Sequence, residues 1–376
     1  MQSSAIPRRC FLATLVLAAW HEARAEAGDF AEALEKIRAK HRLPALAAAA
    51  MIEGKLVMHD AVGVRRAGDA MPATAEDKWH IGSCTKSMTA TLAAMLVEDG
   101  KFAWDTKIGT VFPEWADTME PAWREVSLLH LLAHRGGAPA EPPGNLWLNA
   151  WRATGTPVEQ RIDFVRGLLL RRPEAAPGKK FIYSNQGYAI AGAMIERTMG
   201  RAWEDLLRER VFVPLKMKSA GFGAPGDAKK IDQPWGHRVA GEEAKPVPPG
   251  PGADNPIAIG PAGRVHCSVA DLARYAAWHA REARTTARGL GPESFRKLHT
   301  PPFGGDYALG WLVVQRPWAG GTALTHAGSN TMWKVVMWVA PAKDAAFVAA
   351  TNIASKDSDP GCDEAISAML ERTLKK

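Results

Sequence analysis

Strand-like segments occur at both ends of this sequence, with helix-like segments between them. Two apolar stretches, 46–52 and 56–62, flank Glu53-Gly54-Lys55, a combination typical of a β-hairpin. Further strand-like stretches lie near the carboxyl end, over 307–315, 322–327, 331–339 and 345–352. They precede an amphipathic helix expected at about 362–375. This arrangement predicts an α/β (α+β) fold, in which both termini build one antiparallel sheet flanked by helices.

The middle of the chain predicts an inserted, all-helical region. From 101 to about 240 the pattern is mostly helical, with a capping box at Thr156-Pro157-Val158-Glu159 and a long helix near 185–211. Residues 246–261 contain six prolines, so we expect a surface loop there. The predicted α/β part comprises 26–100 and 265–376, the helical insertion comprises 101–264, and a cleft between them is the expected site.

The first 25 residues are typical of an export signal. Arg8 and Arg9 precede an apolar run that ends at Trp20, and small residues follow up to a predicted cleavage after Ala25. The run is too short for the roughly 20 residues that a membrane-spanning helix needs. The double arginine resembles the twin-arginine signal, with an ordinary secretory signal as the alternative. We therefore expect a periplasmic or secreted protein without a membrane span in the mature chain.

Charge and cysteine content exclude some functions. Removal of the first 25 residues takes away three Arg and one Glu, which lowers the formal net charge from +7 to +5. This modest charge includes no Lys/Arg block, so nucleic-acid binding is not expected. The three remaining cysteines, Cys84, Cys267 and Cys362, form no disulfide framework. Buried free thiols are expected, with a Cys84–Cys267 bridge as the alternative.

The segment Ser83-Cys84-Thr85-Lys86 carries the first candidate chemistry. It precedes a periodic apolar run that ends near Gly100, so Ser83 is predicted at a helix N-terminus. A spacing of three places the Ser83 hydroxyl and the Lys86 amine on one helical face. A lysine whose pKa is lowered by desolvation can act as the base that activates a serine. The alternative is a capped helix with a solvated lysine.

Two further segments complete the candidate site. Tyr183-Ser184-Asn185 is expected in a turn, where the Tyr183 phenol would move the serine proton if the Lys86 ammonium lowers the phenol pKa. Asn185 would hold a substrate amide or carbonyl. His326-Ala327-Gly328-Ser329 lies on a predicted strand, where Gly328 would let a substrate backbone approach closely. The alternatives are a buried tyrosine with an asparagine cap, and a half-buried strand histidine.

In their order and spacing, these three segments resemble the serine β-lactamase and penicillin-binding-protein family, especially its class C, DD-peptidase and esterase branch. The similarity lengthens the second segment to 183–188 and extends to three further segments, over 131–137, 260–263 and 268–272. The resemblance implies Ser83 as the acylated nucleophile, Lys86 and Tyr183 as proton-transfer partners, and Asn185 as a substrate contact. It also implies His326 in substrate recognition, together with an oxyanion hole formed by the backbone N–H groups of Ser83 and Ser329.

One departure from the family pattern bears on the substrate. Most β-lactamases of this kind have Lys where this chain has His326, and a histidine with a pKa of about 6.5 is only roughly a quarter protonated at neutral pH. The sequence therefore favours an esterase or a DD-/D-amino-acid peptidase, which cleaves an ester or amide in a small molecule or peptide without a cofactor or metal. The alternatives are a class C-type β-lactamase and a penicillin-binding sensor that does not turn over. His130 and His134 are spaced for a zinc site, but a packed or capping pair is expected.

Overall fold

The structure is a computed structural model that describes residues 29–281 and 289–374. The predicted export signal, residues 1–25, lies outside the described residues. Within the described ranges, no helix is both long and apolar enough to cross a membrane.

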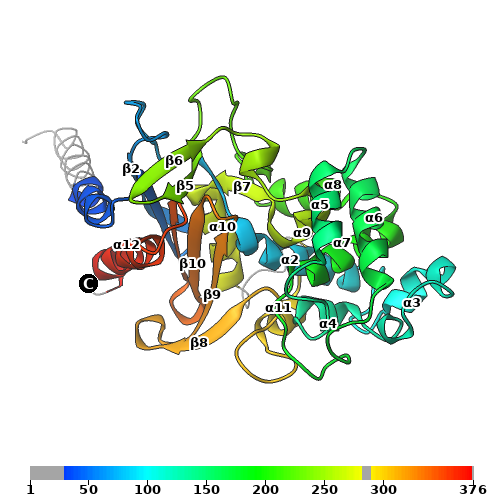
Figure 1. Ribbon diagram of the computed structural model, residues 1–376. Coiled ribbons are helices and arrows are strands. Elements are labelled where there is room, and N and C mark those ends of the chain that lie inside the picture. Colours follow the sequence, from blue (N-terminus) through cyan, green and yellow to red (C-terminus); the bar gives the residue numbers. More distant parts are fainter. Residues whose placement is uncertain (1–28, 282–288, 375–376) are drawn as a thin grey trace, which may run out of the picture.

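A six-stranded antiparallel sheet joins the two ends of the chain (Figure 1). Its strand order is β2-β1-β11-β10-β9-β8. The strands span Ala45–Ile52 (β1), Lys55–Gly63 (β2), Leu312–Arg316 (β8), Gly321–Ser329 (β9), Lys334–Ala340 (β10) and Ala345–Thr351 (β11). Because β1 pairs with β11, the beginning and end of the chain lie side by side at the centre of the sheet. This confirms the predicted fold class.

Small residues in the central strands let helices cover both faces of the sheet. β1 and β11 consist largely of alanine and are buried almost throughout. One face packs against α12 (Ser358–Thr373) and a helix over 29–40, which was not predicted. The other face packs against α10 (Val269–Ala280), as Figure 1 shows. Burial on both faces explains why these strands read as continuous apolar runs rather than as alternating ones.

The ends of several predicted strands and helices differ from the sequence-based boundaries. The β1–β2 hairpin is confirmed, with its turn at Glu53 and Gly54, which both have positive φ. The stretch predicted as a strand from 307 becomes extended only at Leu312, because Gly310 adopts a φ of 78°. Helix α12 begins earlier than expected, at Ser358, since Pro360 is tolerated in a first helical turn.

Helices dominate the middle of the chain. They are α3 (Ile108–Val111), α4 (Leu128–Leu132), α5 (Gly144–Arg152), α6 (Pro157–Leu169), α7 (Asn185–Met199) and α8 (Trp203–Leu207). The capping box at the start of α6 is confirmed, since Thr156 and Glu159 bond reciprocally. The single helix expected near 185–211 is wrong: α7 ends where Gly200 turns left-handed, and α8 follows as a separate helix.

Two small sheets accompany the large one. Strands β3 (Lys78–His80), β7 (Val265–Ser268) and β4 (Gly221–Phe222) form one of them, and β5 (Gly236–Ala240) pairs with β6 (Glu243–Val247) in the other. Three of these strands, β4, β5 and β6, interrupt the region predicted as helical. The β5–β6 hairpin is too short to produce a clear period in the sequence. The proline-rich stretch predicted as a surface loop is also partly buried, because Asp254 there accepts hydrogen bonds from Arg264.

Candidate active site

Ser83 lies in a short 3₁₀ turn, η1 (Gly82–Cys84), that leads into helix α2 (Thr85–Glu98). The turn packs backbone to backbone against strand β9. A Cβ atom at Gly82 would lie 2.3 Å from the Ser329 nitrogen, and one at Gly328 would lie 2.0 Å from the Ile81 oxygen. Both glycines are therefore required by close packing within the chain. The close approach of a substrate backbone to Gly328 stays a prediction; the segment that the structure places against this glycine is the serine turn.

Helix α2 holds Lys86 in the interior, close to the serine. The helix is buried on all sides over residues 85–96 rather than along one stripe, so it forms the centre of the molecule (Figure 1). The Lys86 side chain is 0% exposed, and its Nζ lies 2.9 Å from Ser83 Oγ. The helical spacing of three residues thus brings the two groups together, as predicted, and rules out a solvated lysine.

Burial makes the uncharged amine of Lys86 accessible near neutral pH. Burial lowers the pKa of Lys86 to about 7. Its Nζ donates to Asn185 Oδ1 at 2.6 Å and to the Ala262 carbonyl at 2.9 Å, and both of these oxygens can only accept. A neutral amine has two N–H donors and one lone pair. In the neutral form, with both N–H groups given to these oxygens, the lone pair can accept the Ser83 hydroxyl proton, whereas in the ammonium form the third N–H donates to Ser83 Oγ.

Tyr183 lies beside both Ser83 and Lys86 and keeps its proton. Its ring centroid lies 4.8 Å from Lys86 Nζ. Although 39% of the residue is exposed, burial of the phenol raises the pKa of Tyr183 to about 12, and a hydrogen bond with Ser83 only partly offsets this rise. The condition set for Tyr183 as a proton shuttle, a phenol pKa lowered by the Lys86 ammonium, is therefore not met. At neutral pH the phenol is a proton donor.

Asn185 begins helix α7 and contacts the lysine. Ser184 caps the helix, with its hydroxyl accepting from the Gly187 nitrogen. Because the Asn185 side-chain oxygen accepts from Lys86 Nζ, it orients the amine. The amide nitrogen of Asn185 has no hydrogen-bond partner among the described residues, so it is available to a substrate. The role of Asn185 as a substrate contact stays a prediction.

His326 is buried and neutral. The side chain is 4% exposed, and burial, reinforced by the nearby Lys86, lowers the pKa of His326 to about 3. Nδ1 lies 2.7 Å from the Ala327 oxygen and therefore carries the hydrogen. Nε2 lies 3.5 Å from the Tyr307 hydroxyl. The partial charge expected at neutral pH from an unperturbed histidine is thus absent.

The two histidines with zinc-like spacing have structural roles. His130 completes a capping box with Ser127 at the start of α4. The His134 ring accepts a hydrogen bond from the Ser184 nitrogen at 3.1 Å and lies 3.2 Å from the Tyr307 hydroxyl, so it supports the turn that carries Tyr183. No group of three or more potential metal ligands occurs within 29–281 and 289–374. The packed and capping interpretation is confirmed.

The cysteines are also structural. Cys84, Cys267 and Cys362 are free and buried, which confirms the expected thiols over the alternative bridge. Burial raises the pKa of the Cys84 thiol to about 12, so it stays protonated beside the serine.

Sequence reasoning missed two contributors to the site. The Ala262 carbonyl accepts a hydrogen bond from Lys86, whereas the sequence indicated only a family-like segment over 260–263. Tyr307 links His134 to His326, but it lies in an irregular segment that was predicted as a strand. A backbone carbonyl and a loop tyrosine leave no periodic signal in a sequence.

A serine with a buried lysine three residues later, set between an antiparallel sheet and a helical region, defines the class of serine hydrolases that work without a histidine base. The comparisons agree with this class. The β-lactamase family model matches residues 30–369, and the chain belongs to that family of serine hydrolases.

Individual relatives support the assignment. Penicillin-binding protein 4 of Amycolatopsis lactamdurans is 30% identical over 71% of this chain and 66% of its own length. A β-lactamase of Escherichia coli strain K12 is 25% identical over 74% of this chain and 68% of its own length. The chain therefore spans about two thirds of these curated relatives. An octameric penicillin-binding protein homologue from Pyrococcus abyssi shares the fold, with a TM-score of 0.73, 23% identity, and coverage of 92% of this chain and 79% of that one.

Proposed function

We propose that this enzyme cleaves an ester or amide through an acyl-serine intermediate on Ser83, as an esterase or a DD-/D-amino-acid peptidase. The observation that carries the proposal is the buried Lys86 amine, 2.9 Å from the Ser83 hydroxyl and with a pKa near that of a base suited to neutral pH. A general base of this kind contributes about 10²- to 10⁴-fold to the rate.

In the acylation step, Ser83 Oγ attacks the carbonyl carbon while its proton passes to Lys86 Nζ. The backbone N–H groups of Ser83 and Ser329 are the proposed donors to the oxyanion, each worth roughly 3 kcal/mol in related chemistry. When the tetrahedral intermediate collapses, the Tyr183 phenol gives its proton to the leaving oxygen or nitrogen. Lys86 returns the proton to the phenolate, so acid and base regain their starting states.

In the deacylation step, a water molecule attacks the acyl-serine carbonyl and replaces the leaving group. Lys86 again accepts the proton, and the departing Ser83 oxygen takes it back. Neither step needs a second base, because one buried amine lies next to the oxygen that both steps involve.

The neutrality of His326 determines the ranking of the candidate substrate classes. Since burial keeps this histidine neutral, it supplies no fixed positive charge for the carboxylate of a β-lactam. This supports a broad esterase or peptidase-like hydrolase ahead of a DD-carboxypeptidase, and both ahead of a β-lactamase. The names of the relatives, which include a penicillin-binding protein and a β-lactamase, fit the same reaction class.

The proposed place of action is the periplasm or the exterior of the cell. Its support is the sequence alone, where Arg8 and Arg9 precede a short apolar run and a small-residue cleavage site.

The test uses active-site probes on the wild type, on Ser83→Ala and on Ser367→Ala, which alters an exposed hydroxyl on α12. Each protein is incubated with a fluorophosphonate, a fluorescent penicillin and p-nitrophenyl esters. Fluorophosphonate labelling and ester turnover are expected for the wild type and Ser367→Ala, and neither is expected for Ser83→Ala. A label that persists on Ser83→Ala would overturn the nucleophile, and stoichiometric labelling without turnover would favour the non-turnover sensor.

A further inference from the structure

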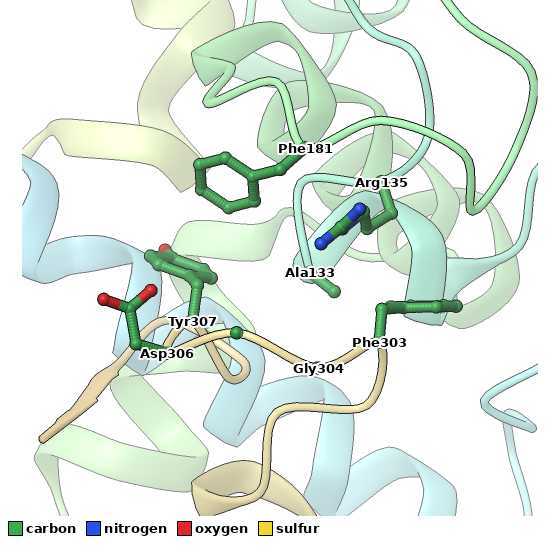
Figure 2. Close-up of a pocket in the computed structure, with 8 residues that line it drawn as sticks. Ala133, Arg135, Phe181, Phe303, Gly304, Asp306 and Tyr307 are labelled. Atoms are coloured by element: carbon green, nitrogen blue, oxygen red, sulfur yellow. The ribbon is translucent and has the colours of Figure 1, made fainter.

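A cavity beside the site combines aromatic walls with a positively charged side chain. It has a volume of about 250 Å³. It is lined by Ala133, Arg135, Phe181, Phe303, and the segment Gly304–Tyr307. Figure 2 shows Phe181, Tyr307 and Arg135 arranged around this space.

The aromatic walls are held in place by their neighbours. The rings of Phe181 and Tyr307 lie 5.5 Å apart at a tilt of 55°, and Phe303 stacks on His130 at 5.4 Å. Phe181 is nevertheless 40% exposed. An aromatic ring that is fixed in position and still open to solvent presents a face on which an apolar group can pack.

Hydrogen bonds hold the backbone of Arg135, whereas its guanidinium contacts an aromatic ring. The Arg135 nitrogen donates to the His130 oxygen at 2.7 Å, and its carbonyl accepts from the Gly178 nitrogen at 2.8 Å. The guanidinium lies 5.8 Å from the Phe181 ring centroid and points toward the cavity in Figure 2. Across the described residues it has no ion pair or side-chain hydrogen bond. A half-buried guanidinium of this kind is suited to bidentate binding of a carboxylate.

The cavity adjoins the reacting groups on one side. The Tyr307 ring lies 6.3 Å from the Tyr183 ring, and the Tyr307 hydroxyl lies 3.5 Å from His326. Tyr183 is the proposed donor of the proton to the leaving group. A group that occupies the cavity therefore belongs to the leaving-group side of the scissile bond.

We propose that Arg135, Phe181 and Tyr307 form a subsite for a leaving group that carries both a free carboxylate and an aromatic or large apolar side chain. This rests on the proposed acyl-transfer function and narrows its substrate class. Arg135 supplies the fixed positive charge that neutral His326 lacks. Asp306 also lines the cavity, but its exposed carboxylate points away from Arg135 in Figure 2, so it leaves the guanidinium available to a ligand carboxylate.

The kinetic test compares two acetyl esters that differ only in charge. One has 2-hydroxy-3-phenylpropanoate as its alcohol part, and the other has the corresponding primary amide. In Arg135→Gln we expect kcat/KM for the carboxylate to fall at least about tenfold, which corresponds to about 1.4 kcal/mol, with the amide within about twofold. Asp306→Asn is the charge-matched control and should preserve or increase carboxylate preference. Equal effects of Arg135→Gln on both esters, or no effect, would overturn the subsite.

A binding measurement tests the subsite independently of turnover. The dissociation constants of 3-phenylpropanoate and 3-phenylpropanamide are measured by calorimetry for the wild type, Arg135→Gln and Phe181→Ala. The acid should bind the wild type at least about tenfold more tightly than the amide, Arg135→Gln should abolish this difference, and Phe181→Ala should weaken both ligands. Equal affinity of acid and amide for the wild type would reject the subsite.

Fluorophosphonate labelling separates the two proposals. Labelling of Ser83 without acid selectivity leaves the acyl-transfer function standing and rejects the subsite. Acid-selective binding without labelling supports the carboxylate site and rejects the acyl-transfer function. An unchanged labelling rate in Arg135→Gln shows that this variant is folded.

Discussion

At the scale of single residues, the buried amine of Lys86 determines how activity depends on pH. Its pKa is lowered to about 7 by burial, so the fraction of neutral amine increases with pH and levels off above that value. We expect kcat/KM for a neutral ester to rise about tenfold per pH unit on the acidic side and to reach a plateau above the Lys86 pKa. The measurement is a pH–rate profile with p-nitrophenyl acetate.

Substitution of Lys86 provides the control for this profile. Lys86→Met removes the base and should lower kcat/KM by about 10²- to 10⁴-fold. Lys86→Arg keeps a positive charge that does not dissociate near neutral pH, so it should not restore the activity. A wild-type rate that falls with increasing pH over the same range would contradict the role of Lys86 as base.

His326 makes a second prediction at this scale. Because its pKa is lowered to about 3, its charge does not change near neutrality. The ratio of kcat/KM for a carboxylated ester to that for its neutral analogue should therefore stay constant between about pH 5 and pH 8, the range in which an unperturbed histidine titrates. A ratio that declines through the ordinary histidine pKa would instead show that a charged His326 recognises the carboxylate.

At the scale of elements, the contact between strand β9 and the serine turn is the critical one. A Cβ at Gly328 would approach the Ile81 oxygen to 2.0 Å, so Gly328→Ala must push the two segments apart. We expect kcat/KM to fall by at least about 10²-fold, which is the effect of losing one oxyanion donor, because Ser83 and Ser329 lose their alignment. The assay is ester hydrolysis, with the thermal midpoint of unfolding measured in parallel.

The neighbouring position supplies a matched control. Ala327 lies on the same strand and is exposed, so Ala327→Ser should change the unfolding free energy by no more than about 0.5 kcal/mol. Wild-type activity in Gly328→Ala would show that the packing at this contact is unimportant for catalysis.

At the scale of the whole molecule, a buried ion-pair cluster ties the helical region together. Arg161 on α6 is fully buried and pairs with Glu196 on α7 and with Glu204 on α8. Arg161→Met leaves two buried carboxylates without their cation, and we expect a loss of about 3–5 kcal/mol in the free energy of unfolding. Urea denaturation measures it.

The control is an exposed ion pair that also involves helix α7, the helix that carries Glu196 of the buried cluster. Arg197 pairs with Glu114 at the surface, so Arg197→Met should cost no more than about 1 kcal/mol. Equal stability losses in the two variants would mean that burial does not determine the strength of the Arg161 cluster.

Local geometry made part of this protein predictable from its sequence. The spacing of Ser83 and Lys86 brings them together on any helix, the Glu53-Gly54 turn forms a hairpin, and Thr156 caps a helix by bonds within four residues. Each of these depends on neighbours in the chain, whose positions the backbone dihedrals fix. The order of the three motifs likewise indicated the family.

The tertiary structure alone decided the chemical state of the site. Burial lowers the pKa of Lys86 to about 7, and its amine contacts the Ala262 carbonyl, 176 residues away in the sequence. The neutrality of His326 and the position of Arg135 beside Phe181 also arise from segments brought together by packing. Desolvation depends on every element that excludes water from a group, so no local pattern encodes it. The sequence by itself determined which groups carry the chemistry, whereas the packed structure determined their protonation and their access to substrate.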